Sequence, residues 1–117
     1  MARALAGSHV VVVGATGVLG ARIAAHFATA GARVSAIVRD HTRLDGSSVS
    51  QYALADVTDH AALSTAFASV APFDGVVNAT GVVAFGNVSD LDDATLAKLF
   101  AVNAIAPIVM LRASASL

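Results

Sequence analysis

Three glycines at a spacing of three residues lie between an apolar run and an amphipathic run. They belong to the stretch GATGVLG, from Gly14 to Gly20, which follows HVVVV. A glycine loop that joins a strand to a helix presents free backbone N–H groups and the positive end of the helix dipole to an anion. These residues therefore favour binding of a pyrophosphate group. A nucleotide-triphosphate loop is not expected, because no Gly-Lys-Ser/Thr follows.

Each glycine of this loop has a separate expected role. Gly14 permits the tight turn off the strand, Gly17 lets the backbone approach a pyrophosphate, and Gly20 lets the helix pack closely on the sheet. The other residues that we expect to take part in the cofactor loop are Thr16, Val18 and Leu19.

An arginine follows the second strand-like run and bears on the choice of cofactor. A carboxylate at this point usually binds the adenosine ribose hydroxyls, whereas a nearby arginine accommodates a 2′-phosphate. Here Val38 is followed by Arg39, with Arg43 close by. The sequence therefore favours NADP over NAD. Asp40, next to Arg39, could take the ribose instead.

Strand-like and helix-like segments alternate along the chain. Short apolar or β-branched runs predict strands, and runs with apolar residues at helical spacing predict helices. The predicted strands are Val10–Val13, Arg33–Val38, Gln51–Leu54 and Gly75–Asn78. The predicted helices are Val18–Ala30, Asp59–Ala71, and a third one capped by Asp92 or Asp93 with a kink at Pro107.

Apolar residues mark one face of each of the first two helices. In the first helix these are Leu19, Ile23 and Phe27, and in the second they are Leu63, Phe67 and Val70. Alternation of strands and helices with short turns predicts an α/β fold with right-handed crossovers. We expect a Rossmann-type doubly wound parallel sheet in the order 3-2-1-4. That order places the glycine loop at the switch point where such sheets bind ligands.

The composition excludes several classes of function. The chain has 117 residues, 56% of them hydrophobic, and a net charge of −1, so it has no broad nucleic-acid footprint. Its longest late uncharged run, Leu99–Leu111, is shorter than the roughly 20 residues of a membrane span. Cysteine is absent, which fits a cytoplasmic protein. The four histidines are scattered without ligand spacing, so no metal site is expected.

Four landmarks in order give the chain a resemblance to the short-chain dehydrogenase/reductase family from Val10 to its end. GATGVLG looks like the cofactor loop of that family. ADVTD is similar to its Asp-Val segment, which implies that Asp56 lies against the adenine amino group and Val57 against the ring.

The other two landmarks lie in the second half of the chain. VVNATG resembles the Asn-Asn-Ala-Gly motif, which implies cofactor contacts from Asn78, Ala79 and Gly81. FAVNAIAP is similar to the segment that carries an active-site asparagine, here Asn103. Asn103 could instead be structural, bonding backbone at a helix irregularity.

The chain also departs from the family pattern. Compact members usually have Gly-x-x-x-Gly-x-Gly after a threonine, whereas Val13 and Val18 stand at two of those positions here. The loop and the segment AIVRD are closer to extended and atypical members, while NATG and VNAIAP look like compact reductases. Thr80 replaces the usual alanine, which predicts altered local hydrogen bonding. Subfamily and substrate stay open.

Most of the family's catalytic residues have no counterpart in this sequence. The resemblance implies hydride transfer between nicotinamide and a carbonyl or alcohol carbon, with a tyrosine as general acid/base and a lysine four residues on that lowers its pKa. The chain has one tyrosine, Tyr52, and one lysine, Lys98, and Asp56 lies four residues after Tyr52. Of the catalytic set only Asn103 has a match.

We therefore expect an NADP(H)-dependent short-chain oxidoreductase represented by its cofactor-binding half. The domain expected over residues 1–117 is an NAD(P)-binding Rossmann domain that stops before a fifth strand. One alternative is a catalytically silent NAD(P)-binding or redox-sensing module of the atypical type, and another is a structural remnant with a decayed site. We expect no nucleic-acid or membrane partner, a small-molecule substrate of unknown identity, and a homo-oligomer at full length.

Overall fold

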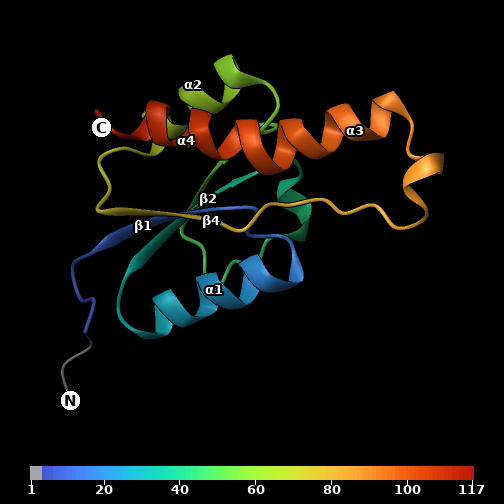
Figure 1. Ribbon diagram of the computed structural model, residues 1–117. Coiled ribbons are helices and arrows are strands. Elements are labelled where there is room, and N and C mark those ends of the chain that lie inside the picture. The colour runs from blue at the N-terminus through green and yellow to red at the C-terminus, as the bar shows by residue number, and fades with distance from the viewer. Residues whose placement is uncertain (1–3) are drawn as a thin grey trace.

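The computed structural model describes residues 4–117 as one parallel sheet with helices on both faces (Figure 1). Helix α1 covers one face, and α2 lies with the α3–α4 segment on the other. The strands are β1 His9–Val13, β2 Arg33–Val38, β3 Gln51–Leu54 and β4 Gly75–Asn78. The longer helices are α1 Val18–Thr29, α2 His60–Val70, α3 Asp93–Phe100 and α4 Ala106–Ser114. Three shorter elements are the 3₁₀ turns η1 His41–Arg43 and η2 Val88–Asp90 and the π-helical η3 Ala101–Ile105.

The four strands run parallel in the order β3-β2-β1-β4, which confirms the predicted topology. Val13 aligns with both Ile37 and Asn78, and Val38 aligns with Leu54. The carboxyl ends of the strands therefore meet at one edge of the sheet. The loops that follow them, the glycine loop included, surround a single region at that edge.

Strand residues alternate between two hydrophobic clusters, one on each face of the sheet. Val11, Val13 and Ile37 pack with residues of α2 and α4 on one face, where Phe67 and Leu63 are fully buried. The opposite cluster joins Val10, Val12, Val34 and Ala36 to Ala24 of α1. Every residue of β1 is buried, as the unbroken apolar run of a central parallel strand requires.

The predicted apolar face of the first helix is wrong at Leu19, whose side chain is 65% exposed. The helix instead meets the sheet through the buried Ala24, with Ile23 and Phe27 partly buried beside it. The first turn packs through the backbone of Gly20 on the glycine loop, at Gly14 and Ala15, and the neighbouring Leu19 stays exposed.

A buried polar network ties the strands together at the edge opposite the glycine loop. His9 is only 5% exposed, and its Nε2 lies 2.6 Å from the Oγ of the fully buried Ser35. Ser35 Oγ also donates to Gln51 Oε1 at 3.2 Å, so the contacts cross β1, β2 and β3. His9 therefore has a structural role, at the edge of the sheet opposite the glycine loop.

The segments α3, η3 and α4 form one helical run from Asp93 to Ser114. By length and composition alone it could cross a membrane, with 22 residues and a mean hydropathy of 1.8 in its most apolar window. In the fold, its buried residues Ala106, Val109 and Met110 pack in the cluster with α2. The irregularity expected at Pro107 is the π-helical turn that ends at Ile105, and Pro107 itself lies in the first turn of α4.

Candidate functional site

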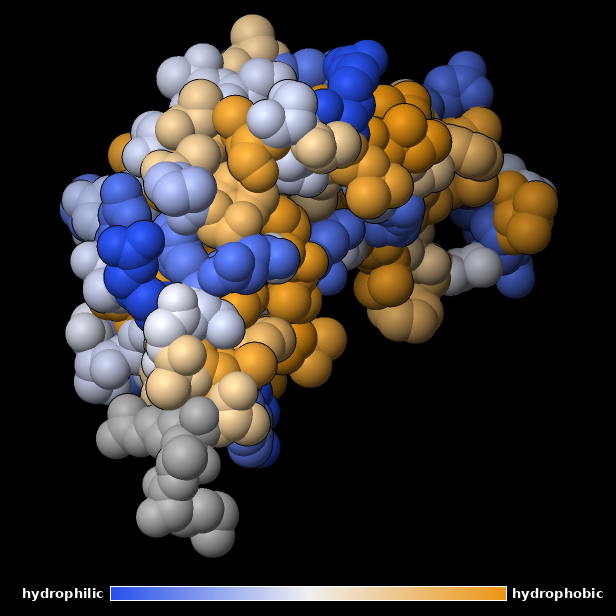
Figure 2. All heavy atoms as spheres, turned by 90° about the vertical axis from the view of Figure 1, so that its left-hand side faces the viewer, coloured by the Kyte–Doolittle hydropathy of each residue, from blue (hydrophilic) through white to orange (hydrophobic). Residues whose placement is uncertain are grey.

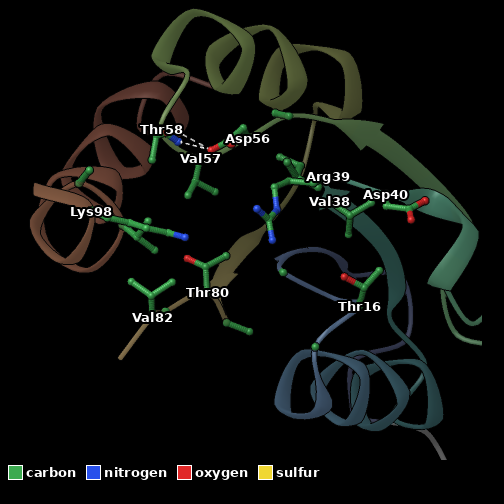
Figure 3. A pocket seen from close by; sticks show the side chains of 18 of the residues that line it. Thr16, Val38, Arg39, Asp40, Asp56, Val57, Thr58, Thr80, Val82 and Lys98 are labelled. Carbon is green, nitrogen blue, oxygen red and sulfur yellow. Dashed lines mark hydrogen bonds between the residues drawn. The ribbon is translucent and has the colours of Figure 1, made fainter. Parts of the chain in front are cut away.

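A cleft with a volume of about 680 Å³ opens at the carboxyl edge of the sheet (Figure 3). Its walls come from the glycine loop, the ends of β2, β3 and β4, and the inner side of α3 and η3. The parallel register brings these segments together. The cleft therefore lies at the switch point between β1 and β4, where the chain order of the sheet reverses.

The glycine loop has the backbone geometry that its sequence predicts. Gly14 has a φ of +86°, which favours glycine, and its N–H donates to Ile37 O at 2.9 Å. A Cβ on Gly20 would lie 2.0 Å from Gly14 O, so only glycine fits there. A Cβ on Gly17 would have Gly14 O as its nearest neighbour at 3.6 Å. The space in front of Gly17 is thus open to a ligand, and Gly17 caps α1 without a side-chain hydrogen bond.

Most of the residues predicted to bind the cofactor line this cleft. They are Gly14, Thr16, Gly17, Arg39, Asp56, Val57, Ala79 and Gly81. Four others lie outside it. Val18 and Leu19 are exposed in the first turn of α1, Gly20 lies against the backbone of Gly14, and Asn78 accepts hydrogen bonds from Thr80. Direct cofactor contacts remain predictions for all twelve residues.

An acid or amide followed two residues later by threonine recurs after three of the strands. In each pair the Oδ1 atom accepts hydrogen bonds from both the backbone N–H and the hydroxyl of the threonine, at distances of 2.6 to 3.0 Å. These turns fix the backbone where each strand enters the cleft. Sequence reasoning missed this repeat, although its spacing is visible. The pairs are Asp40–Thr42, Asp56–Thr58 and Asn78–Thr80.

These hydrogen bonds also stabilise the ionised form of Asp40 and Asp56. The backbone N–H and then the hydroxyl of Thr58 lower the pKa of Asp56, and the charges of Arg39 and Lys98 lower it further. The pKa of Asp40 is lowered first by the hydroxyl of Thr42 and then by its backbone N–H. Both carboxylates are therefore ionised at neutral pH.

Two cationic side chains point into the cavity from opposite sides (Figure 3). Arg39 extends from the end of β2, and Lys98 extends from α3, whereas the carboxylate of Asp40 points away. Lys98 was not expected here. Lys98 lies four residues before Val102, which is buried and lines the cleft, so the two share one side of the helix. This spacing is the feature of the sequence that could have indicated the position of Lys98.

Asn103 lies in the π-helical η3, and its side chain is paired with backbone. Its Oδ1 accepts from Val82 N at 2.9 Å, and its Nδ2 donates to Val82 O at 2.7 Å. The amide thus holds the loop after β4 against the helix. This agrees with the structural interpretation of Asn103 at a helix irregularity, and its catalytic role stays a prediction.

The fold and the cleft together define a dinucleotide-binding α/β domain of the Rossmann type. A family model described as short chain dehydrogenase matches residues 8–117. The chain therefore belongs to the short-chain dehydrogenase/reductase family.

Individual relatives agree with this assignment. The chain is 36% identical over 108 residues to galactitol 2-dehydrogenase (L-tagatose-forming) of Cereibacter sphaeroides, covering 85% of this chain and 42% of that protein. It matches a dehydrogenase/reductase from Sinorhizobium meliloti 1021 with a TM-score of 0.86 and 25% identity, covering 98% of this chain and 51% of the other. The chain thus spans about half the length of the relatives it matches.

Two more distant solved structures share the fold and hold different cofactors. One is an actinorhodin polyketide ketoreductase with NADPH, at a TM-score of 0.84 and 22% identity, covering 92% of this chain and 46% of the other. The second is an NADH-dependent reductase complexed with NAD, with a TM-score of 0.81 and 20% identity, covering 97% of this chain and 53% of the other. Proteins of this fold thus include one with NADPH and one with NAD.

Proposed function

We propose that this chain is the cofactor-binding part of an NADP(H)-dependent oxidoreductase that acts on a carbonyl or alcohol carbon. Family membership supports the reaction class, and the cleft supports the site. When bound, the nicotinamide would supply or accept the hydride. The proposal places the protein in the cytoplasm, as a homo-oligomer, with a small molecule as substrate.

The residues of the cleft fit a dinucleotide. Gly17 leaves open space in front of the α1 N-terminus, where a pyrophosphate would meet free N–H groups. Asp56 and Val57 line the opposite part of the cleft, where they would hold the adenine. Because Thr58 satisfies one oxygen of Asp56 and keeps the carboxyl ionised, the other oxygen can accept a bond from an amino group.

The orientation of Arg39 relative to Asp40 carries the preference for NADP(H). Arg39 points into the cleft (Figure 3), while Oδ1 of Asp40 accepts two hydrogen bonds from Thr42. A guanidinium binds a phosphate through charge-assisted hydrogen bonds. An inward arginine and an outward carboxylate favour a 2′-phosphate over free ribose hydroxyls.

Titration with NADPH and NADH tests this proposal. We expect the chain to bind NADPH more tightly, and Arg39→Asp to narrow or reverse the ratio of the two affinities. Arg22→Asp is the matched control, because Arg22 is exposed on α1 and outside the cleft. An unchanged NADPH/NADH ratio in Arg39→Asp would refute the assignment to NADP(H).

A catalytically silent NAD(P)-binding or redox-sensing module is the second candidate. It is favoured by the position of Tyr52 on β3, where its ring stacks on His41 with centroids 4.9 Å apart, outside the cleft. The sole tyrosine of the chain is thus not placed to act on a substrate in this cleft. Both candidates expect this chain by itself to bind NADPH without turnover. A serine and a Tyr-x-x-x-Lys in any sequence that follows Leu117 would favour the oxidoreductase, and a following sequence that lacks them would favour the silent module.

A further inference from the structure

Thr80 lies between the two loops that form the floor of the cleft (Figure 3). A Cβ built on Gly14 would lie 2.8 Å from Thr80 Cγ2 and 3.0 Å from Ala79 O. The methyl group of Thr80 therefore occupies the space that a side chain on Gly14 would need. The loop after β4 therefore packs against the glycine loop at this point.

The hydroxyl of Thr80 is bound on the other side. It donates to Asn78 Oδ1 at 2.6 Å, and the same oxygen accepts from Thr80 N at 3.0 Å. The two substituents on the β carbon thus have separate partners. One contacts the glycine loop, and the other holds the end of β4.

The rest of this short segment is fixed at both ends. Ala79 N donates to Val13 O at 2.9 Å, which continues the pairing of β4 with β1. Val82 is held by both polar atoms of the Asn103 side chain. Between these anchors, Thr80 is the residue whose side chain contacts the glycine loop.

We propose that Thr80 is a positioning residue for the nucleotide, because it fixes the spacing between the glycine loop and the loop after β4. This inference rests on the proposed function, since both loops line the cleft assigned to the dinucleotide. A ligand that contacts both loops gains affinity when their spacing is fixed beforehand. A ligand that reaches only the adenosine end gains nothing from this spacing.

Three substitutions at Thr80 distinguish the contribution of its methyl group from that of its hydroxyl group. Thr80→Ser removes the methyl, Thr80→Val removes the hydroxyl, and Thr80→Ala removes both. Binding would be measured with NADPH and with adenosine 2′,5′-bisphosphate, which lacks the nicotinamide half. We expect Thr80→Ala to weaken NADPH binding by about three- to tenfold. The NADPH affinities of Thr80→Ser and Thr80→Val should lie between that of Thr80→Ala and that of the wild type. Affinity for the bisphosphate should change by less than about twofold.

Ser47 supplies the matched control. It makes the same kind of turn with Asp45, and neither residue lines the cleft, so Ser47→Ala should leave NADPH affinity unchanged. Thermal melts accompany every titration, and Thr80→Ser and Thr80→Val carry the test should Thr80→Ala fail to fold.

The possible outcomes separate the two proposals. Failure of the wild type to bind either ligand would overturn the proposed function itself. Tight NADPH binding by all three Thr80 variants would overturn only the role of Thr80. Equal weakening of both ligands, together with a lower melting temperature, would mean general destabilisation and would also overturn it.

Discussion

The contact between Gly20 and Gly14 leaves no room for even a methyl group. Gly20→Ala would place a Cβ 2.0 Å from a backbone carbonyl oxygen, and backbone cannot move aside as a flexible side chain can. We expect a loss of about 1–3 kcal/mol in the free energy of unfolding, measured by urea denaturation. Gly46→Ala is the control, because nothing lies within 4 Å of its added Cβ, and it should change stability little. Equal stabilities for the two variants would contradict this account.

Protonation of Asp56 makes the stability of the fold depend on pH. Its pKa is lowered in the fold, first by the backbone N–H and then by the hydroxyl of Thr58. A lowered pKa adds stability that is present above the ordinary aspartate value of about 3.9 and is lost as pH falls through the folded value. We expect Thr58→Val to move the titration of the Asp56 carboxyl to higher pH, followed by NMR. An unmoved titration would show that the hydroxyl contributes nothing.

At the scale of elements, the cleft depends on one connection between η3 and the loop after β4. Asn103→Ala removes both hydrogen bonds to Val82 and frees that loop from the helix. A hydrogen bond contributes a net of about 0.5–1.5 kcal/mol, and both of these bonds are exposed to water. We therefore expect a loss of about 1 kcal/mol in the free energy of unfolding. Hydrogen exchange should also become faster at Val82.

Ser114→Ala is the matched control for this element. Ser114 Oγ donates to Met110 O within the same helical run, but it contacts no part of the cleft. Exchange at Val82 should be unchanged in Ser114→Ala. If Asn103→Ala left exchange at Val82 as slow as in the wild type, the proposed connection would be wrong.

At the scale of the whole molecule, hydrophobic side chains stay on the surface. The radius of gyration is 15.3 Å, against about 13 Å for a compact domain of this length. Figure 2 shows hydrophobic side chains gathered at the upper right and through the middle of this face, with most of its left side hydrophilic. Phe100, Ile108 and Leu111 are each more than half exposed.

These exposed residues predict association of the purified chain. We expect it to bind ANS and to elute larger than a monomer in size-exclusion chromatography. The double substitution Ile108→Glu and Leu111→Glu should reduce both effects, because it places charge on the apolar side of α4. Val88→Glu, on the distant η2 turn, serves as control. A monomeric wild type that binds no ANS would contradict the prediction.

Much of this architecture could be predicted from local sequence. The run HVVVV predicts a strand covered on both faces, and similar short runs predict the bounds of β2, β3 and β4. The alternation of elements predicts a parallel sheet, and the glycine loop after the first strand favours the Rossmann-type strand order. The prediction that Leu19 lies on the apolar face was wrong, because a helical period cannot reveal that Gly20 brings the backbone of the first turn against the glycine loop.

The sequence by itself determined the glycine loop, because tolerance of the positive φ found at Gly14 and the lack of a Cβ at Gly20 are properties of glycine. Only the tertiary structure decided that Arg39 faces the cleft and Asp40 does not, and that Lys98 enters the cleft from α3. It also decided that the side-chain amide of Asn103 is hydrogen-bonded to the backbone of Val82. The physical reason is that the direction of a side chain depends on partners far away in the sequence. Local spacing cannot specify those partners.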